Sequence, residues 1–149
     1  MTVTLKDIAL PEFGVPEARP GLPKALFADR IARLRAAARA AGLDALVVYA
    51  DREHFANMAY LLDFEPRFEE ALLILVEGRT PTLVTGPENV GRAGASPVEL
   101  EVVKYPPFGL LGQDRSSTRQ LLDVLREAGL AAGTIGTAGW KYYSREETP

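Results

Sequence analysis

The spacing of apolar and polar residues predicts an alternation of short strands and helices. Runs of apolar and β-branched residues have the lengths of strands at 44–49, 71–76, 82–85, 98–103 and 134–138. Helical spacing predicts helices over 26–41 and 55–62, a short one starting at 86–89, and one opened by a capping box of Ser117 and Gln120. This order predicts an α/β fold with three layers: a mixed five- to six-stranded sheet with helices on both faces.

Two of the helices are expected to end in the same way. The segments 39–45 and 126–132 share arginine, alanine, glycine, leucine and alanine in register. Glycine adopts the left-handed conformation just past a helix, and the apolar residue after it packs back, which is the Schellman motif. Gly42 and Leu43 therefore predict the end of the first helix. Two such units are too few for a repeat array.

Residues 1–25 differ from the rest of the chain because they contain four prolines. Proline removes backbone donors, so we expect an extended arm, with at most a short edge strand near residues 3–8. Its apolar residues Leu10, Phe13 and Leu22 predict that it packs against another surface. The folded domain is expected to span residues 26–149.

Composition excludes several classes of function. The net charge of −3 gives no basic surface for nucleic acid or for an anionic membrane. The sequence contains no cysteine, which excludes disulfides, thiol catalysis and thiolate metal sites. No apolar run is long enough to span a bilayer, and residues 1–7 lack the pattern of a signal peptide. A cytoplasmic protein is the resulting expectation.

Few residues carry recognisable chemistry. His54, the only histidine, follows the first strand in the polar turn 51–54, at the end of a sheet where ligands often bind. It fits a structural residue at a loop-to-helix junction, a substrate contact or a pH sensor. The sequence has no nucleophile elbow, and the glycines of 133–139 match no nucleotide-binding pattern. Adjacent Glu69 and Glu70 point to opposite sides of an extended segment, so they cannot act as a paired acid and base.

Three segments taken in order resemble the N-terminal domain of the creatinase/prolidase family of Xaa-Pro peptidases. They are Gly42-Leu-Asp-Ala-Leu-Val-Val-Tyr49, Asn57-Met-Ala-Tyr-Leu-Leu-Asp-Phe64 and Pro66-Arg-Phe-Glu-Glu-Ala-Leu-Leu-Ile74. The resemblance covers about residues 26–140. Leu62 and Asp63 stand where the family usually has threonine and glycine. Because aspartate tolerates a left-handed backbone, we expect the turn there to persist.

The resemblance implies a non-catalytic domain. In the family, a C-terminal "pita-bread" domain carries the peptidase chemistry and two divalent metals (manganese, cobalt or zinc), except in creatinase-like members. Nothing in this sequence matches that domain, so we expect no metal site and no catalytic residue here. The implied partners are that domain and a second copy in a homodimer, and the implied roles are oligomer contacts and closure of the active site. A free-standing α/β module that binds a small molecule or a protein is the alternative, which the sequence beyond Pro149 would decide.

The same resemblance directs attention to one loop. Creatinase-like relatives use an aromatic residue and an arginine from this region to reach substrate in the neighbouring subunit. Arg67 and Phe68 are therefore the leading substrate-contact candidates, acting in trans, with Arg52 and His54 beside them. A surface ion pair of Arg67 with Glu69 or Glu70, next to a core phenylalanine, is the structural alternative.

Overall fold

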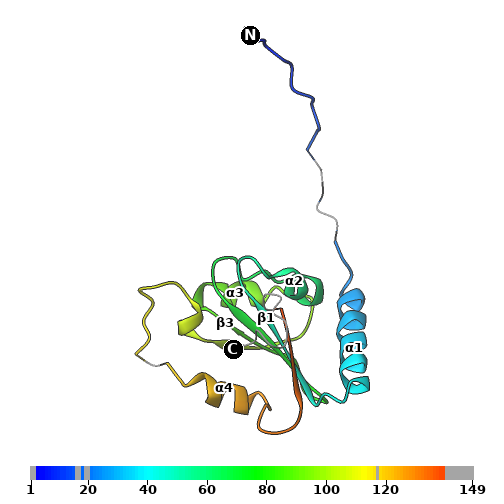
Figure 1. Ribbon diagram of the computed structural model, residues 1–149, viewed down its shortest axis with the longest axis vertical. Coiled ribbons are helices and arrows are strands. Elements are labelled where there is room, and N and C mark those ends of the chain that lie inside the picture. Colours follow the sequence, from blue (N-terminus) through cyan, green and yellow to red (C-terminus); the bar gives the residue numbers. More distant parts are fainter. Residues whose placement is uncertain (1–2, 16–17, 19–20, 117, 140–149) are drawn as a thin grey trace.

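A computed structural model describes residues 3–15, 18, 21–116 and 118–139. Its body is a mixed sheet with helices on both faces (Figure 1), as the sequence predicts. The strands are β1 (Ala45–Ala50), β2 (Ala71–Val76), β3 (Thr82–Thr85), β4 (Glu101–Lys104) and β5 (Ile135–Ala138). The helices are α1 (Lys24–Ala40), α2 (Ala56–Leu62), α3 (Val90–Ala93) and α4 (Leu121–Glu127), with short 3-10 turns η1 (Pro87–Asn89) and η2 (Pro106–Phe108).

The five strands are ordered β4-β3-β2-β1-β5. β2 runs antiparallel to both of its neighbours, whereas β5 pairs parallel with β1 and β4 pairs parallel with β3. Ala50 therefore lies opposite Ala71, and Ala71 lies opposite Thr85. As a result, β1, β3, β4 and β5 all end at the edge where β2 begins. We call this edge the carboxyl edge.

The core lies in two layers because alternate residues of each strand point to opposite faces. Buried residues of α1, α2 and α3 pack on one face, over strand residues such as Val48 and Leu73. Val124 and Ala128 from the α4 segment cover the other face, over Val47 and others. The helix predicted over 26–41 is confirmed as α1, which buries Phe27 and Ile31.

Both predicted helix ends are Schellman motifs. After α1, the Leu43 backbone N–H donates to the Ala38 carbonyl at 3.0 Å, and Gly42 has φ +72°. After α4, Leu130 N–H donates to Leu125 O at 3.0 Å. The helix α2 ends at Leu62, and the φ of 52° at the next residue, Asp63, confirms that the turn persists without the family's glycine.

Two local predictions, the capping box and the start of the fourth strand, are wrong, and the short edge strand allowed for residues 3–8 is absent. Gln120 is extended (φ −65°, ψ 136°) and precedes α4, so it cannot be the third helical residue of a capping box, and Ser117 lies outside the described residues. β4 begins at Glu101 instead of residue 98, because the Ser96 hydroxyl ties this segment to Leu62 O and Val98 N. Residues 3–8 form no strand, since no neighbouring strand lies beside them.

The part of the arm at residues 3–15 also does not pack on the described body of the chain. Its apolar side chains between Val3 and Val15 are 73–99% exposed, and Figure 1 shows it standing away from the body. Within the described residues, no helix is both long and apolar enough to cross a membrane.

Candidate functional site

The loops at the carboxyl edge hold all four residues proposed from the sequence. Arg52 and His54 follow β1, and Arg67 and Phe68 precede β2. The two loops are neighbours because Ala50 and Ala71, which bound them, are paired in the sheet. Between the two pairs, no hydrogen bond or ion pair is found within the described residues. The structure thus brings the four residues to one edge without joining them into a single cluster.

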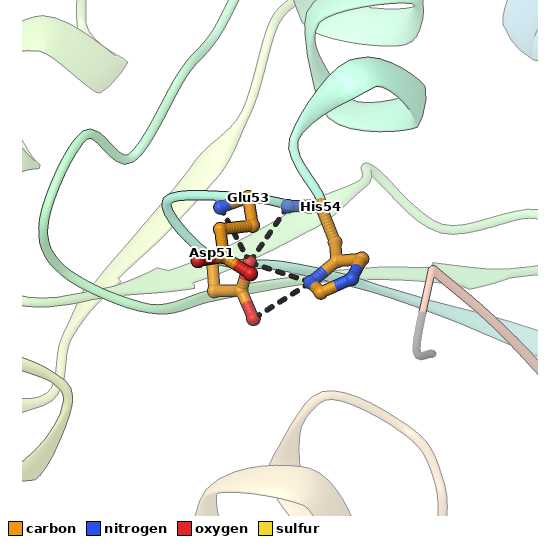
Figure 2. Close-up of polar contacts among 3 residues, drawn as sticks. All are labelled: Asp51, Glu53 and His54. Carbon is orange, nitrogen blue, oxygen red and sulfur yellow. Dashed lines mark hydrogen bonds and ion pairs between the residues drawn. The ribbon is translucent and has the colours of Figure 1, made fainter. Parts of the chain in front are cut away.

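The loop after β1 is organised by the Asp51 carboxylate (Figure 2). Its Oδ1 accepts the backbone N–H groups of Glu53 and His54 at 2.8 and 2.7 Å. The Nδ1 atom of His54 lies 2.9 Å from the same oxygen. Burial alone would raise the pKa of Asp51, but the backbone N–H groups of His54 and Glu53, together with the imidazole, hold it below its ordinary value. This turn fixes His54, while Arg52 is exposed.

A tyrosine that sequence reasoning missed lies beside this loop. Burial, followed by the nearby carboxylates of Glu70 and Asp51, raises the pKa of the Tyr49 hydroxyl. Continuing the β1–β2 register past Ala50 and Ala71 places Asp51 opposite Glu70. Tyr49 shares their face because it lies two residues from Asp51. The strand period could have identified this group, once the pairing of β1 with β2 was known.

The turn before β2 carries the leading candidates. Glu69 N–H donates to Pro66 O at 3.0 Å, so residues 66–69 form a β-turn with Arg67 in its second position. Arg67 has φ +57°, a left-handed conformation that non-glycine residues adopt at a cost. Phe68 is 43% exposed, and the Arg67 guanidinium lies 5.7 Å from its ring centroid.

The structural alternative predicted for this turn was a surface ion pair of Arg67 with Glu69 or Glu70. That prediction is wrong for Glu69. Glu69 is 1% exposed, and its carboxylate contacts Glu88 and Asn89 instead of Arg67. One oxygen accepts Glu88 N–H at 3.2 Å, and the other accepts the Asn89 N–H at 3.1 Å and the Asn89 side-chain amide at 2.6 Å. Within the described chain no acidic group pairs with Arg67.

The buried Glu69 carboxylate, which we call the Glu69 anchor, lies where three loops of the carboxyl edge meet: the turn 66–69, the segment 86–89 and the loop at Gly109. The Asn89 amide also donates to Pro66 O at 2.8 Å, which ties the start of the turn to η1. Gly86 lies so close that a Cβ there would clash with the Glu69 carboxyl group, and a Cβ at Gly109 would sit 3.1 Å from the Glu69 Oε1 atom. Glu69 was predicted only to point away from Glu70, which is confirmed; its burial and its partner twenty residues away were not foreseen.

These residues do not form a metal centre. In the part of the chain that the structure describes, no three His, Asp or Glu side chains converge on a common point. The two divalent metals that the family resemblance implies for a separate domain find no matching set of donors among the described residues. What the edge offers is an exposed cation and an aromatic ring on a fixed turn. Such a pair can bind an anionic or planar group and cover an apolar one.

Comparisons with known proteins agree with the resemblance seen in the sequence. The model of the creatinase/prolidase N-terminal domain matches residues 30–144. A comparison with curated proteins finds no match. An Xaa-Pro dipeptidase from Bacillus anthracis is similar in structure, with a TM-score of 0.53 and 17% identity over 81% of this chain and 29% of that one.

Two other solved structures are similar over part of the fold. A dipeptidase from Mycobacterium ulcerans is 24% identical over 56% of this chain and 23% of its own, with a TM-score of 0.43. An Xaa-Pro aminopeptidase from Streptococcus pyogenes is 17% identical over 77% of this chain and 94% of its own, with a TM-score of 0.47. This chain thus spans less than a third of the length of the two dipeptidases.

Proposed function

This chain belongs to the creatinase/prolidase N-terminal domain family, and on that premise we propose that it is the non-catalytic N-terminal domain of an Xaa-Pro aminopeptidase- or dipeptidase-like metallohydrolase. Residues 26–149 form the domain, and residues 1–25 form its arm. A separate C-terminal domain supplies the metals and the peptidase chemistry in the cytoplasm. This domain contributes contacts between subunits and closes the active site of a neighbouring one.

The conformation of Arg67 is the observation that carries the proposal. A left-handed arginine costs on the order of 1 kcal/mol relative to a relaxed backbone. Its side chain recovers little among the residues that the structure describes, since the distant stacking on Phe68 is the one interaction found for it there. Strain of this kind, held in place by a buried anchor, is typical of residues positioned for a ligand. Arg67 is therefore best explained by a group that arrives from outside the chain.

The geometry suits a peptide substrate. The guanidinium presents a planar fork that can bind a carboxylate through two hydrogen bonds. Phe68, 43% exposed, can cover an apolar side chain or a proline ring next to it. Arg52 and His54 lie at the same edge and would contact a more distant part of the substrate.

The proposal is tested by kinetics on the full-length enzyme. Arg67→Ala should lower kcat/KM for a Xaa-Pro substrate by about 10–150-fold, because one charged hydrogen bond to substrate is worth about 1.5–3 kcal/mol. Arg67→Lys should recover only part of the loss, since lysine lacks the planar fork.

The matched control is Arg92→Ala, which removes an exposed arginine of α3. It should leave kcat/KM unchanged. If Arg67→Ala folds normally and also leaves kcat/KM unchanged, the turn has no part in binding substrate.

A further inference from the structure

One side chain spans the turn that carries Arg67. The Nδ2 atom of Asn89 donates to Pro66 O at 2.8 Å and to Glu69 Oε2 at 2.6 Å. Pro66 and Glu69 are the first and the fourth residue of the β-turn, and Arg67 lies between them. A single NH2 group, which belongs to η1, thus holds both ends of the turn.

The two acceptors determine how the Asn89 amide is oriented. The Pro66 carbonyl oxygen only accepts, and Glu69 Oε2 already accepts the Asn89 backbone N–H at 3.1 Å. The NH2 group of Asn89 must therefore face them, and its carbonyl oxygen must not. Asn89 is 3% exposed, Glu69 is 1% exposed and Pro66 is also fully buried. Because water does not compete for these hydrogen bonds, each is stronger than it would be at the surface.

The base of the turn is closed, whereas its tip is open. At the base, a Cβ at Gly86 would clash with the Glu69 carboxyl group, so the carboxyl group fills the space there. The next residue is also held, because Glu70 N–H donates to Phe108 O at 3.1 Å. At the tip, Arg67 is exposed. The direction in which its side chain leaves the turn is therefore set by the base.

The left-handed backbone of Arg67 needs such a constraint. Its φ is +57°, and arginine has no intrinsic preference for this region. Strained conformations of this kind persist only where the surrounding structure holds them. Among the described residues, Asn89 is the side chain from outside the turn that is found bonded to both of its ends. Without this amide, the Arg67 backbone is free to relax toward negative φ, and the guanidinium then points elsewhere for part of the time.

We propose that Asn89 is a positioning residue for the contact between Arg67 and substrate. Its side-chain amide keeps the turn in the conformation that presents the guanidinium, and it touches no substrate itself. This inference rests on the proposed function and deepens it, because it names the residue that sets the direction of the binding group. Asn89 acts from the buried base, on a different loop from Arg67.

A double-mutant cycle on the full-length enzyme tests this role. Asn89→Ala should lower kcat/KM for an Xaa-Pro substrate by about 3–30-fold, because kcat/KM falls with the fraction of molecules in which the turn presents Arg67. Where Arg67 is already replaced by alanine, adding Asn89→Ala should change kcat/KM by less than about twofold, because no guanidinium is left to position. A residue that only stabilises the fold would cost the same factor in both backgrounds.

The matched control for the cycle is Asp44→Ala. Asp44 Oδ2 accepts the Thr134 backbone N–H at 2.7 Å, at the edge of the sheet opposite the carboxyl edge. Its loss removes another long-range side-chain bond without touching the turn, so kcat/KM should stay unchanged. All variants are compared at a temperature at which circular dichroism shows them folded. If Asn89→Ala does not fold, Asn89→Ser takes its place, because a hydroxyl can donate to one of the two acceptors.

The outcomes of the cycle separate this inference from the proposed function. Equal losses from Asn89→Ala in both backgrounds would overturn the positioning role and leave the proposed function intact. The same holds if Asn89→Ala costs nothing while Arg67→Ala lowers kcat/KM. If Arg67→Ala costs nothing, both the proposed function and the positioning role are overturned.

NMR spectroscopy of this chain gives a readout that does not depend on substrate. The backbone couplings and chemical shifts of Arg67 should report a left-handed φ in the parent chain and an averaged φ in Asn89→Ala. The side-chain amide protons of Asn89 in the parent chain should exchange slowly with water. An unchanged Arg67 backbone in Asn89→Ala, or an Asn89 amide that exchanges as fast as an exposed one, would overturn the inference.

Discussion

Each of the two turns that flank β2 contains a residue with a left-handed backbone, but the residue differs between them. The turn after β2 closes with Arg79 N–H donating to Val76 O, and glycine, Gly78, takes the left-handed position at φ +71°. In the turn before β2, Arg67 takes a left-handed position at φ +57°. Glycine adopts this backbone without strain, and arginine does not.

The arginines of the two turns also differ in what they contact. Arg79 donates to the Glu127 carbonyl at 3.0 Å, and its own carbonyl accepts from Arg35 at 2.6 Å. The neighbouring Glu77 pairs with Arg39 at 2.9 Å. Arg67, in contrast, is found among the described residues only in a loose stacking on Phe68. One turn is thus built to join α1, α4 and the sheet, while the other holds a cation outward on a strained backbone. The difference distinguishes a structural turn from a candidate binding turn.

The largest effect is expected at the anchor of the strained turn. Glu69→Ala removes a buried carboxylate that accepts three hydrogen bonds and leaves the donors of Glu88 and Asn89 unsatisfied. The free energy of unfolding should fall by about 3 kcal/mol. Urea denaturation measures it. Glu77→Ala, which breaks an exposed ion pair in the other turn, should cost less than about 1 kcal/mol. Equal losses would mean that Glu69 does not anchor the turn.

Glu69 also shows where prediction from the sequence reached its limit. The strands 71–76 and 82–85 were predicted at their observed bounds, because Gly78 and flanking polar residues delimit an apolar run on each side. The alternation of the strand correctly separated Glu69 from Glu70. Its burial could not be predicted, because the partner is Asn89, twenty residues away, and long-range pairing leaves no local periodicity.

Tertiary contacts that leave no local sequence pattern also explain the other differences between the prediction and the structure. The left-handed Asp63 was predictable because the preference is a property of the residue itself. The left-handed Arg67 was not, since arginine has no such preference and the tertiary structure imposes it. The capping box was predicted wrongly because a motif of two residues does not determine where a helix begins when the helix is packed against a sheet.

Exchanging the residues that the two turns use should give opposite changes in stability. Gly78→Ala should lower the free energy of unfolding by about 1 kcal/mol, because a Cβ there has free space but the backbone is left-handed. Arg67→Gly should raise it by about 0.5 kcal/mol, since relief of strain exceeds the added entropy of the unfolded chain. Thermal and urea unfolding of both variants provide the measurement. Loss of stability in Arg67→Gly would show that the arginine is structural, and the contrast between the turns would disappear.

A further small effect concerns the dependence of stability on pH at the neighbouring loop after β1. The pKa of Asp51 is lower in the folded chain than its ordinary value of 3.8, because the hydrogen bonds from the His54 and Glu53 backbone and from the imidazole outweigh burial. An acidic group whose pKa is lower in the folded than in the unfolded chain stabilises the fold at pH values above its unfolded pKa. This stabilisation is lost as the pH falls through the pKa of the folded chain. Asp51→Asn should therefore cost about 0.5–1 kcal/mol at neutral pH, and its difference from the parent chain should shrink below about pH 4. Unfolding curves of both chains over this range provide the measurement. A difference that stays constant into acid would show that the carboxylate charge has no part in holding this loop.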